Sequence, residues 1–253
     1  NITLNAPITS SGTSTVTINS SGNVIDGING SFVGKIISTN LLLTGNGNFN
    51  LDSTTNNVSI ISAGSNASRL GSLNFTNSND LVVGSVGSNS GIYTTGTIAI
   101  STLTGDLSVS QNINTQNTST TALILNASQS TAAGVSSGGD LKFSGGASIT
   151  IGANARAKLY SGSISGSTGL TTITGSGSNR FRYNSDESNS NYSLSLGTGI
   201  HAIYRERPSL TIVADDKTVT YGTAPTLTTT VNGLQNGDTA AQTLSTVASV
   251  AVG

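Results

Sequence analysis

Hydrophobic residues along the chain occur in short clusters of Leu, Ile, Val and Ala, and they alternate with polar residues from one end to the other. Alternation with a period of two and runs of β-branched residues predict strands. Clusters of Gly, Asn, Ser or Asp separate these strands, and no window of eleven or more residues has helical periodicity. The pattern predicts an all-β protein, with strands at 16–19, 35–38, 58–61, 73–76, 97–100, 107–109, 123–126 and 149–151.

The predicted strands are short, and the turns between them are equally short. This spacing favours a right-handed parallel β-helix over a β-sandwich, whose strands are longer and whose turns recur every 8–12 residues or so. In such a helix each coil contains three short strands, and equivalent strands stack about 4.8 Å apart. With about 20 residues per coil, residues 1–207 would form about ten coils in a rod about 50 Å long. No strict repeat motif is visible.

The composition supports a folded chain that is poor in charge. Charged residues make up 8%, against about 25% in an ordinary globular domain, and Ser, Thr, Asn and Gly together account for about half of the chain. A mean hydropathy of +0.02 with a net charge of -1 is not typical of disorder. Asn, Ser and Thr side chains are suited to hydrogen-bonded ladders along a stack of strands.

The same composition excludes several function classes. The chain has no Cys and one His, which excludes disulfides, thiol catalysis and zinc sites built from Cys or several His, and disfavours a Ser-His-Asp triad. It has no basic field for nucleic acid, and no run of about 18 apolar residues for membrane insertion. We expect no cofactor, with calcium as the one ion left open. Because the chain begins at Asn1, we expect a processed product or a fragment.

The composition changes near residue 176. Four arginines, both Glu, the only His and three of the six Tyr lie between residues 180 and 207. We predict a β-helical shaft over 1–179, a polar and aromatic cap with a linker over 180–208, and a small antiparallel β-module over 209–253, with strands at 210–213, 219–221 and 227–231. The apolar lid of the cap is expected to consist of Phe181, Tyr183, Tyr192, Ile200 and Tyr204, with Arg205 and Arg207 near solvent.

The last unit resembles a known module. Residues 214–222, Ala-Asp-Asp-Lys-Thr-Val-Thr-Tyr-Gly, and residues 231–239, Val-Asn-Gly-Leu-Gln-Asn-Gly-Asp-Thr, resemble the MBG-type (mostly-β, glycine-rich) repeats of large bacterial surface proteins. Those repeats carry a strand ending in Tyr-Gly and a Gly-Leu-x-Asn-Gly-Asp turn. The likeness covers about 45 residues and implies that this copy is partial.

The preceding region resembles the β-helical shaft of filamentous-haemagglutinin-like adhesins, on strings such as 97–100, 105–109 and 137–143. The resemblance implies a secreted protein that is extracellular or lies at the cell surface. It also implies two kinds of partner. One is other copies or modules of the same surface protein, and the other is glycans or proteins of the cell surface or matrix. The three Pro follow Ala6, Arg207 and Ala224, so the Asn-Pro motif of that family's secretion domain is missing.

Two sets of residues are candidates for binding. Arg180, Arg182 and Tyr183 could pair with or stack on glycans, although alternation would turn Phe181 and Tyr183 inward as a cap strand. Asp215 and Asp216, together with Asp238, could ligate calcium through hard oxygens, although we favour turn and strand-start chemistry as their role.

Two further positions are candidates for catalysis. Asp186-Glu187 is the adjacent acid pair of the cap, and we interpret it as a solvated loop rather than an acid/base pair or a calcium site. His201 lies beside Ile200 and Ala202, and we interpret it as a packed histidine.

Two functions compete on this basis. The first is a structural or adhesive segment of a large secreted bacterial cell-surface protein, with a rigid β-solenoid as a spacer that supports attachment. The alternative is a polysaccharide-binding or polysaccharide-degrading β-helix protein. Residues 1–175 are poor in the acids and aromatic platforms that degradation needs, so the sequence favours the first function and predicts no enzyme. An ice-binding solenoid is disfavoured because Thr-x-Thr strings recur irregularly.

Overall fold

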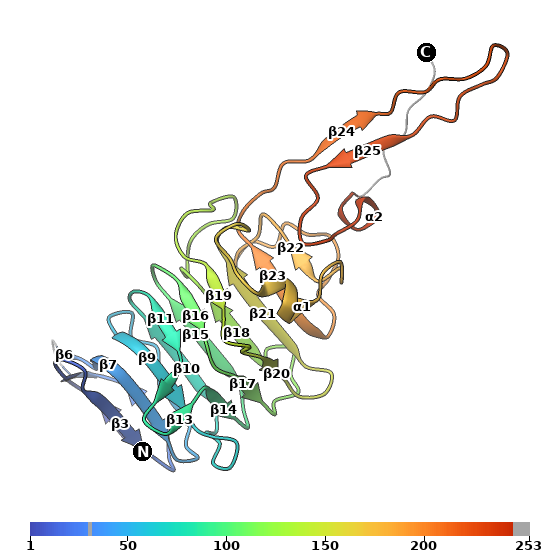
Figure 1. The fold of residues 1–253 in the computed structure, drawn as a ribbon. Coiled ribbons are helices and arrows are strands. Elements are labelled where there is room, and N and C mark those ends of the chain that lie inside the picture. The colour runs from blue at the N-terminus through green and yellow to red at the C-terminus, as the bar shows by residue number, and fades with distance from the viewer. Residues whose placement is uncertain (30–31, 245–253) are drawn as a thin grey trace.

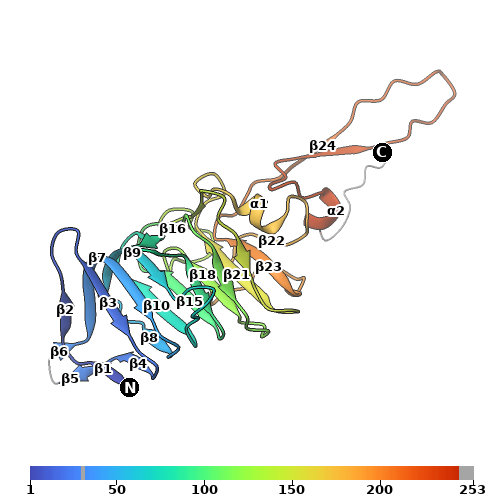
Figure 2. The same ribbon diagram turned by 60° about the horizontal axis from the view of Figure 1, so that its bottom comes forward.

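The computed structural model describes residues 1–29 and 32–244, and it confirms an almost entirely β protein whose main sheets are parallel. Strands of both sheets lie side by side along the molecule, and a narrow hairpin extends from one end (Figures 1 and 2). In the described residues the first sheet has nine strands, in the order β1 (Ile2–Leu4), β4 (Val24–Asp26), β8 (Phe49–Leu51), β10 (Leu73–Asn77), β15 (Ile98–Thr102), β18 (Leu123–Asn126), β21 (Arg156–Ser161), β23 (Gly199–Tyr204) and β22 (Phe181–Arg182).

The second sheet faces the first. In the described residues it contains β2 (Pro7–Thr9), β3 (Thr15–Asn19), β7 (Lys35–Thr44), β9 (Asn57–Ala63), β11 (Leu81–Val83), β14 (Ile92–Thr94), β16 (Leu107–Val109), β17 (Ile113–Thr115), β19 (Leu141–Phe143) and β20 (Ile149–Thr150). The long strands β7 and β9 each pair with more than one short strand on a neighbouring level. We call each level, one strand of the first sheet with the following strand or strands of the second, a rung.

Registered pairing makes the rungs nearly regular. In the first sheet, Val24 pairs with Phe49, Phe49 with Leu73, Leu73 with Ile98 and Ile98 with Leu123, so neighbouring rungs are 24 or 25 residues apart. The rungs are therefore longer than the 20 residues expected, and fewer of them form than the ten predicted. The turns between the sheets contain more residues than the short turns that the sequence predicts, and this lengthens each rung.

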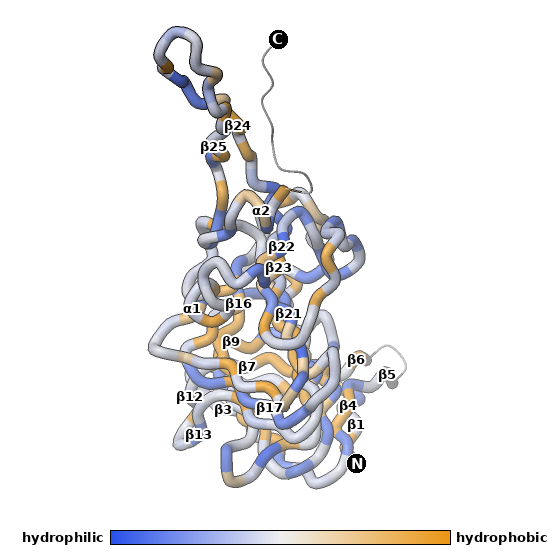
Figure 3. The backbone as a smooth tube through the Cα atoms, turned by 90° about the vertical axis from the view of Figure 1, so that its right-hand side faces the viewer, coloured by the Kyte–Doolittle hydropathy of each residue, from blue (hydrophilic) through white to orange (hydrophobic). Residues whose placement is uncertain are grey.

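The core is a narrow space between the two sheets. The five paired residues just named are at most 1% exposed, and they pack against inward residues of the second sheet such as Leu41 and Ile61. Hydrophobic residues accordingly follow the inside of the coiled backbone and hydrophilic ones its outside (Figure 3). Small aliphatic side chains fill this space because the alternating pattern turns every second residue inward.

Two late rungs carry long insertions. Leu123 pairs with Ala157, and Ala157 pairs with Ile200, which are steps of 34 and 43 residues. The first insertion includes residues 127–139, which we call the 127–139 loop. The second contains α1 (Leu170–Thr174), β22 and a segment, residues 183–198, that reaches the outer face of β21 and β23.

Outside the main sheets lie short antiparallel hairpins, β5 (Ile28–Asn29) with β6 (Phe32–Val33) and β12 (Ser85–Val86) with β13 (Asn89–Ser90). The terminal unit pairs β24 (Thr211–Ala214) with β25 (Thr229–Asn232) and continues to α2 (Ala240–Thr243). This confirms the predicted antiparallel module, but residues 219–221 are not a strand. Within the described chain, no helix has the length and apolar character needed to cross a membrane.

Candidate functional site

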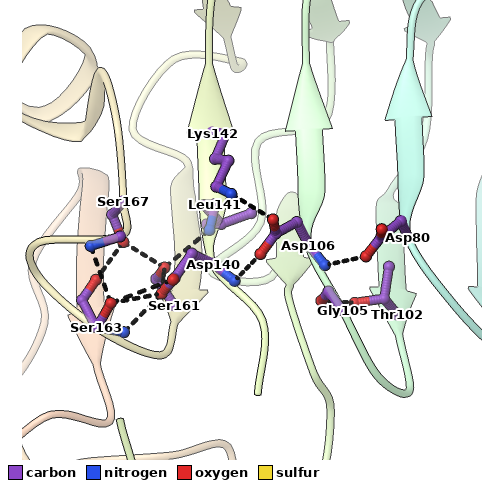
Figure 4. Close-up of polar contacts among 11 residues, drawn as sticks. Asp80, Thr102, Gly105, Asp106, Asp140, Leu141, Lys142, Ser161, Ser163 and Ser167 are labelled. Atoms are coloured by element: carbon purple, nitrogen blue, oxygen red, sulfur yellow. Dashed lines mark hydrogen bonds and ion pairs between the residues drawn. The ribbon is translucent and has the colours of Figure 1, made fainter. Parts of the chain in front are cut away.

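Aspartates at equivalent turns form a ladder along one edge of the second sheet (Figure 4). Asp80, Asp106 and Asp140 each precede the first strand of that sheet in their rung, and the Leu that follows each of them is paired from rung to rung. The N–H of Asp106 donates to Asp80 Oδ1 at 2.7 Å, and the N–H of Asp140 donates to Asp106 Oδ1 at 2.8 Å. Each carboxylate therefore caps the next rung, which fixes the rungs axially.

The ladder ends in a serine cluster. Asp140 Oδ1 accepts the N–H of Ser163 at 2.6 Å, and Ser161 Oγ accepts the N–H of Leu141 at 2.8 Å (Figure 4). Lys142 donates to the second oxygen of Asp106, and this bond raises the pKa of the Lys142 ammonium. Every member of the ladder therefore has a structural partner, and the ladder is suited to cohesion rather than to chemistry.

A second column of polar residues is buried at the corner where the first sheet ends. Asn77 pairs with Thr102, and both are fully buried. Asn77 Oδ1 accepts the N–H of Val58 at 2.8 Å, while its Nδ2 donates to the carbonyls of Val58, Asn79 and Asp80. These bonds satisfy backbone groups of the turn that would otherwise be buried without partners.

Arg205 is buried, which corrects the expectation that it lies near solvent. Its side chain is 0% exposed. Nη1 donates to the carbonyl of Ala127 at 2.7 Å, Nε to that of Thr131 at 2.7 Å, and Nη2 to Asn126 Oδ1 at 2.5 Å and Glu187 Oε2 at 3.2 Å. The guanidinium group of Arg205 thus holds the 127–139 loop, and it is buried because two of its hydrogen-bond acceptors are backbone carbonyls of this loop. Arg207 is exposed, as predicted.

The acid pair Asp186-Glu187 also binds the 127–139 loop, so the interpretation as a solvated loop is wrong for Asp186, which is 6% exposed. Asp186 Oδ2 accepts the N–H of Ala133 at 2.7 Å, and Glu187 Oε1 accepts that of Ser130 at 2.5 Å. Burial works to raise the pKa of Asp186, but the N–H groups of Asn189, Ala133 and Ser188 outweigh it and hold that pKa below its ordinary value. Both carboxylates are committed to backbone donors, which disfavours an acid/base role.

Stacked aromatic rings close the core at this end. Tyr204 stacks on Phe181 with ring centroids 6.5 Å apart and on Tyr183 with centroids 5.7 Å apart. These rings and Ile200 belong to the main core, as the predicted lid requires. Tyr192 does not: it packs with Tyr160, Leu196 and Ile203 on the outer face of the sheet. Tyr192 therefore covers the sheet rather than its open end.

His201 is packed, as predicted, and is 3% exposed. Burial, together with the positive charge of Arg182, lowers its pKa to about 4. The imidazole is therefore neutral at physiological pH.

The glycan candidates are divided by the fold. The carbonyl of Arg180 accepts the N–H of Ala202, and its guanidinium lies so close to Gly199 that a Cβ there would meet Nη1 at 2.8 Å. Arg182 and Tyr183 instead line a pocket of about 290 Å³ between the end of the stack and the terminal unit. The predicted alternation is confirmed, because Phe181 and Tyr183 pack in the main core and Arg182 lies on the opposite face beside Tyr192. Arg182 is nevertheless only 7% exposed, because residues 183–198 cover that outer face.

The Gly-Leu-Gln-Asn-Gly-Asp turn, residues 233–238, contacts the end of the stack. Asn236 Nδ2 donates to Tyr183 Oη at 3.0 Å, and Tyr183 Oη donates to Asp238 Oδ2 at 2.8 Å. The carbonyl of Asn236 accepts the N–H of Gly177 at 2.9 Å. Burial raises the pKa of Tyr183 above its ordinary value, and it also raises that of Asp238. The turn thus joins the terminal unit to the stack through specific polar contacts.

The calcium candidates are not brought together. Asp215 accepts the hydroxyls of Thr228 and Thr230, which lower its pKa, Asp216 is exposed, and Asp238 is bonded to Tyr183. Within residues 1–29 and 32–244, no three acidic or histidine side chains are grouped so that they could hold a metal ion.

Sequence reasoning missed the ladder although a signal was present. The string Asp-Leu-x-Val occurs at 80–83 and 106–109, and it recurs as Asp-Leu-Lys-Phe at 140–143. Its spacing changes from 26 to 34 residues, so a search for a fixed period does not find it.

Comparison with known families identifies the terminal unit. Residues 210–253 match the family model described as MBG domain (YGX type), which confirms the MBG module predicted from its motifs. Residues 245–253 of this match lie outside the described residues. No curated protein and no solved structure matches the chain.

Proposed function

We propose that this chain is a structural and adhesive segment of a large secreted bacterial cell-surface protein. In this proposal residues 1–179 wind as a right-handed parallel β-helix of the filamentous-haemagglutinin-like kind and act as a rigid spacer. Residues 180–208 close its end and connect it to the MBG module, which begins at residue 209. The MBG match supports a surface protein, because such repeats are typical of that class.

The observation that carries the proposal is the continuous axial bonding of the rungs. Parallel pairing runs in register from Ile2 in β1 to Ile200 in β23, and the aspartate ladder adds side-chain bonds across three rungs. A spacer needs neighbouring levels that hold a fixed distance, and repeat stacks obtain this from nearest-neighbour contacts. Chemistry would need groups that remain free, whereas the acids of the ladder and of the 127–139 loop contacts are already bonded.

Attachment is tested with beads that carry the 253-residue chain. Under flow, they are offered sister bacterial cells, matrix-coated surfaces and albumin-coated surfaces. The proposal predicts retention on cells or matrix above that on albumin. Retention equal to albumin on every surface would contradict the adhesive role, while leaving the spacer role to be judged by its dimensions.

The alternative, a polysaccharide-degrading β-helix, is tested separately. The chain is incubated with pectin, alginate and chitin-type polymers, and new reducing ends are measured. We expect none. Release of reducing ends that is lost in Asp186→Asn or Glu187→Gln would overturn this expectation and assign a catalytic role to the acid pair.

A further inference from the structure

The pocket between the stack and the MBG module combines groups from both parts. Arg182 and Tyr183 come from the chain at and after β22, Tyr192 from the segment that covers the outer face, Arg207 from the linker, and Asp238 and Gln242 from the module. Its volume of about 290 Å³ is near the lower end of ligand pockets and suits one sugar ring with its substituents. Pockets at domain junctions are frequent sites for small ligands.

Polar atoms at this pocket lack partners. Among the described residues, neither Arg182 Nε nor Asp238 Oδ1 has a hydrogen-bond partner, although both atoms are buried. Arg182 is only 7% exposed, and its Nη1 already donates to the carbonyls of Asn179 and Phe181. Buried polar groups without partners are costly, so a ligand that donates to Asp238 and accepts from Arg182 would be favoured.

The charges and rings of the pocket define the chemistry of that ligand. Arg182 and Arg207 supply two guanidinium groups against the single carboxylate of Asp238, so the site favours an anion. A guanidinium fork matches a carboxylate in geometry. The Tyr192 ring lies 5.4 Å from the Arg182 guanidinium, and Tyr183 and the amide of Gln242 add an aromatic face and a hydrogen-bonding group.

We propose that this pocket binds a sugar residue that carries a carboxylate, such as the uronate or sialate of an acidic glycan. The carboxylate pairs with Arg182 and Arg207, a ring hydroxyl donates to the carboxylate of Asp238, and the ring lies against the tyrosines. This inference deepens the adhesive role proposed above and rests on it, because it names the chemical class of the attached surface.

The test is saturation-transfer NMR and calorimetry on the 253-residue chain. The probes are glucuronate and galacturonate oligomers, sialyllactose, and the neutral sugars glucose oligomers and lactose. We expect the acidic sugars to bind and the neutral sugars to bind about tenfold more weakly, since hydrogen bonds to charged groups are the strong ones. Comparing the affinities of the uronate oligomers and of sialyllactose shows which carboxylate sugar the pocket prefers.

Matched variants locate the site. Arg207→Gln changes an exposed residue, so the fold should persist while acidic-sugar affinity falls about tenfold. Arg182→Gln should lower the affinity further, and Arg180→Gln, two residues away and outside the lining, should leave it within about twofold. Equal binding of neutral and acidic sugars, no binding of any probe, or binding unchanged in Arg207→Gln would overturn the proposal. If sugars fail to bind while coated beads still attach to cells, the site is wrong and the adhesive role stands.

Discussion

Arg205 and Glu187 form an ion pair, Nη2 to Oε2 at 3.2 Å, in which the arginine side chain is 0% exposed and the glutamate side chain 26%. Because the same guanidinium bonds to the carbonyls of Ala127 and Thr131, its removal leaves buried acceptors without a donor. We predict that Arg205→Met lowers the free energy of unfolding by about 3 kcal/mol. Glu187→Gln, the matched control, should cost less, about 1–2 kcal/mol, because the three uncharged acceptors of Arg205 remain in place. Urea denaturation measures both. Equal losses would show that Arg205 does not anchor the 127–139 loop.

The buried polar column of Asn77 should be more costly to break than an exposed hydrogen bond of the same strand. Asn77→Ala removes a donor and an acceptor for four backbone groups, and we expect a loss of about 2–4 kcal/mol with faster hydrogen exchange in residues 78–81. Asn74→Ala lies in the same strand and removes the bond from Nδ2 to Asn50 Oδ1, which is exposed. That control should cost under about 1 kcal/mol. Similar losses for the two variants would contradict the role given to Asn77.

Two substitutions at Asp106 distinguish its hydrogen bond with the N–H of Asp140 from its ion pair with Lys142. Asp106→Asn keeps an acceptor for the N–H of Asp140 and loses the ion pair with Lys142, which is partly exposed. We expect a cost under about 1 kcal/mol for Asp106→Asn and for Lys142→Gln. Asp106→Ala loses both bonds and should cost about 1–3 kcal/mol. If Asp106→Ala behaves like Lys142→Gln in thermal denaturation, the ladder does not contribute to cohesion between the rungs.

His201 should make the fold sensitive to acid. Its pKa is about 4 in the folded chain, against about 6.5 when unfolded, so between these values only the unfolded state binds the proton. The free energy of unfolding therefore falls as the pH falls through this window, by up to about 2 kcal/mol at pH 5 from this group. His201→Leu should remove that part of the difference between pH 7 and pH 5. An unchanged pH dependence in His201→Leu would contradict the assignment.

Strands could be predicted from the sequence where one face is buried. The alternation in 123–126 gives β18 its bounds, Leu123–Asn126, and the motifs of residues 214–239 identify the MBG module. The contacts of Arg205 could not be predicted, because its partners Asn126 and Ala127 are 79 and 78 residues away in the sequence. The burial of Arg182 could not be predicted either, because it depends on residues 183–198, whose polar composition predicts an exposed loop.

The central claim is that residues of successive rungs are stacked at a fixed spacing along the molecule. Ile25 and Lys158 lie on the same column, joined through Asn50, Asn74, Ala99 and Ile124, so five rung steps place them about 24 Å apart. Because the chain has no Cys, cysteines introduced at these two positions can be spin-labelled without background. Pulsed electron spin resonance should give a narrow distance distribution near 24 Å, allowing for the length of the labels. A broad distribution, or a distance about twice as long, would contradict the stacked architecture and with it the spacer function.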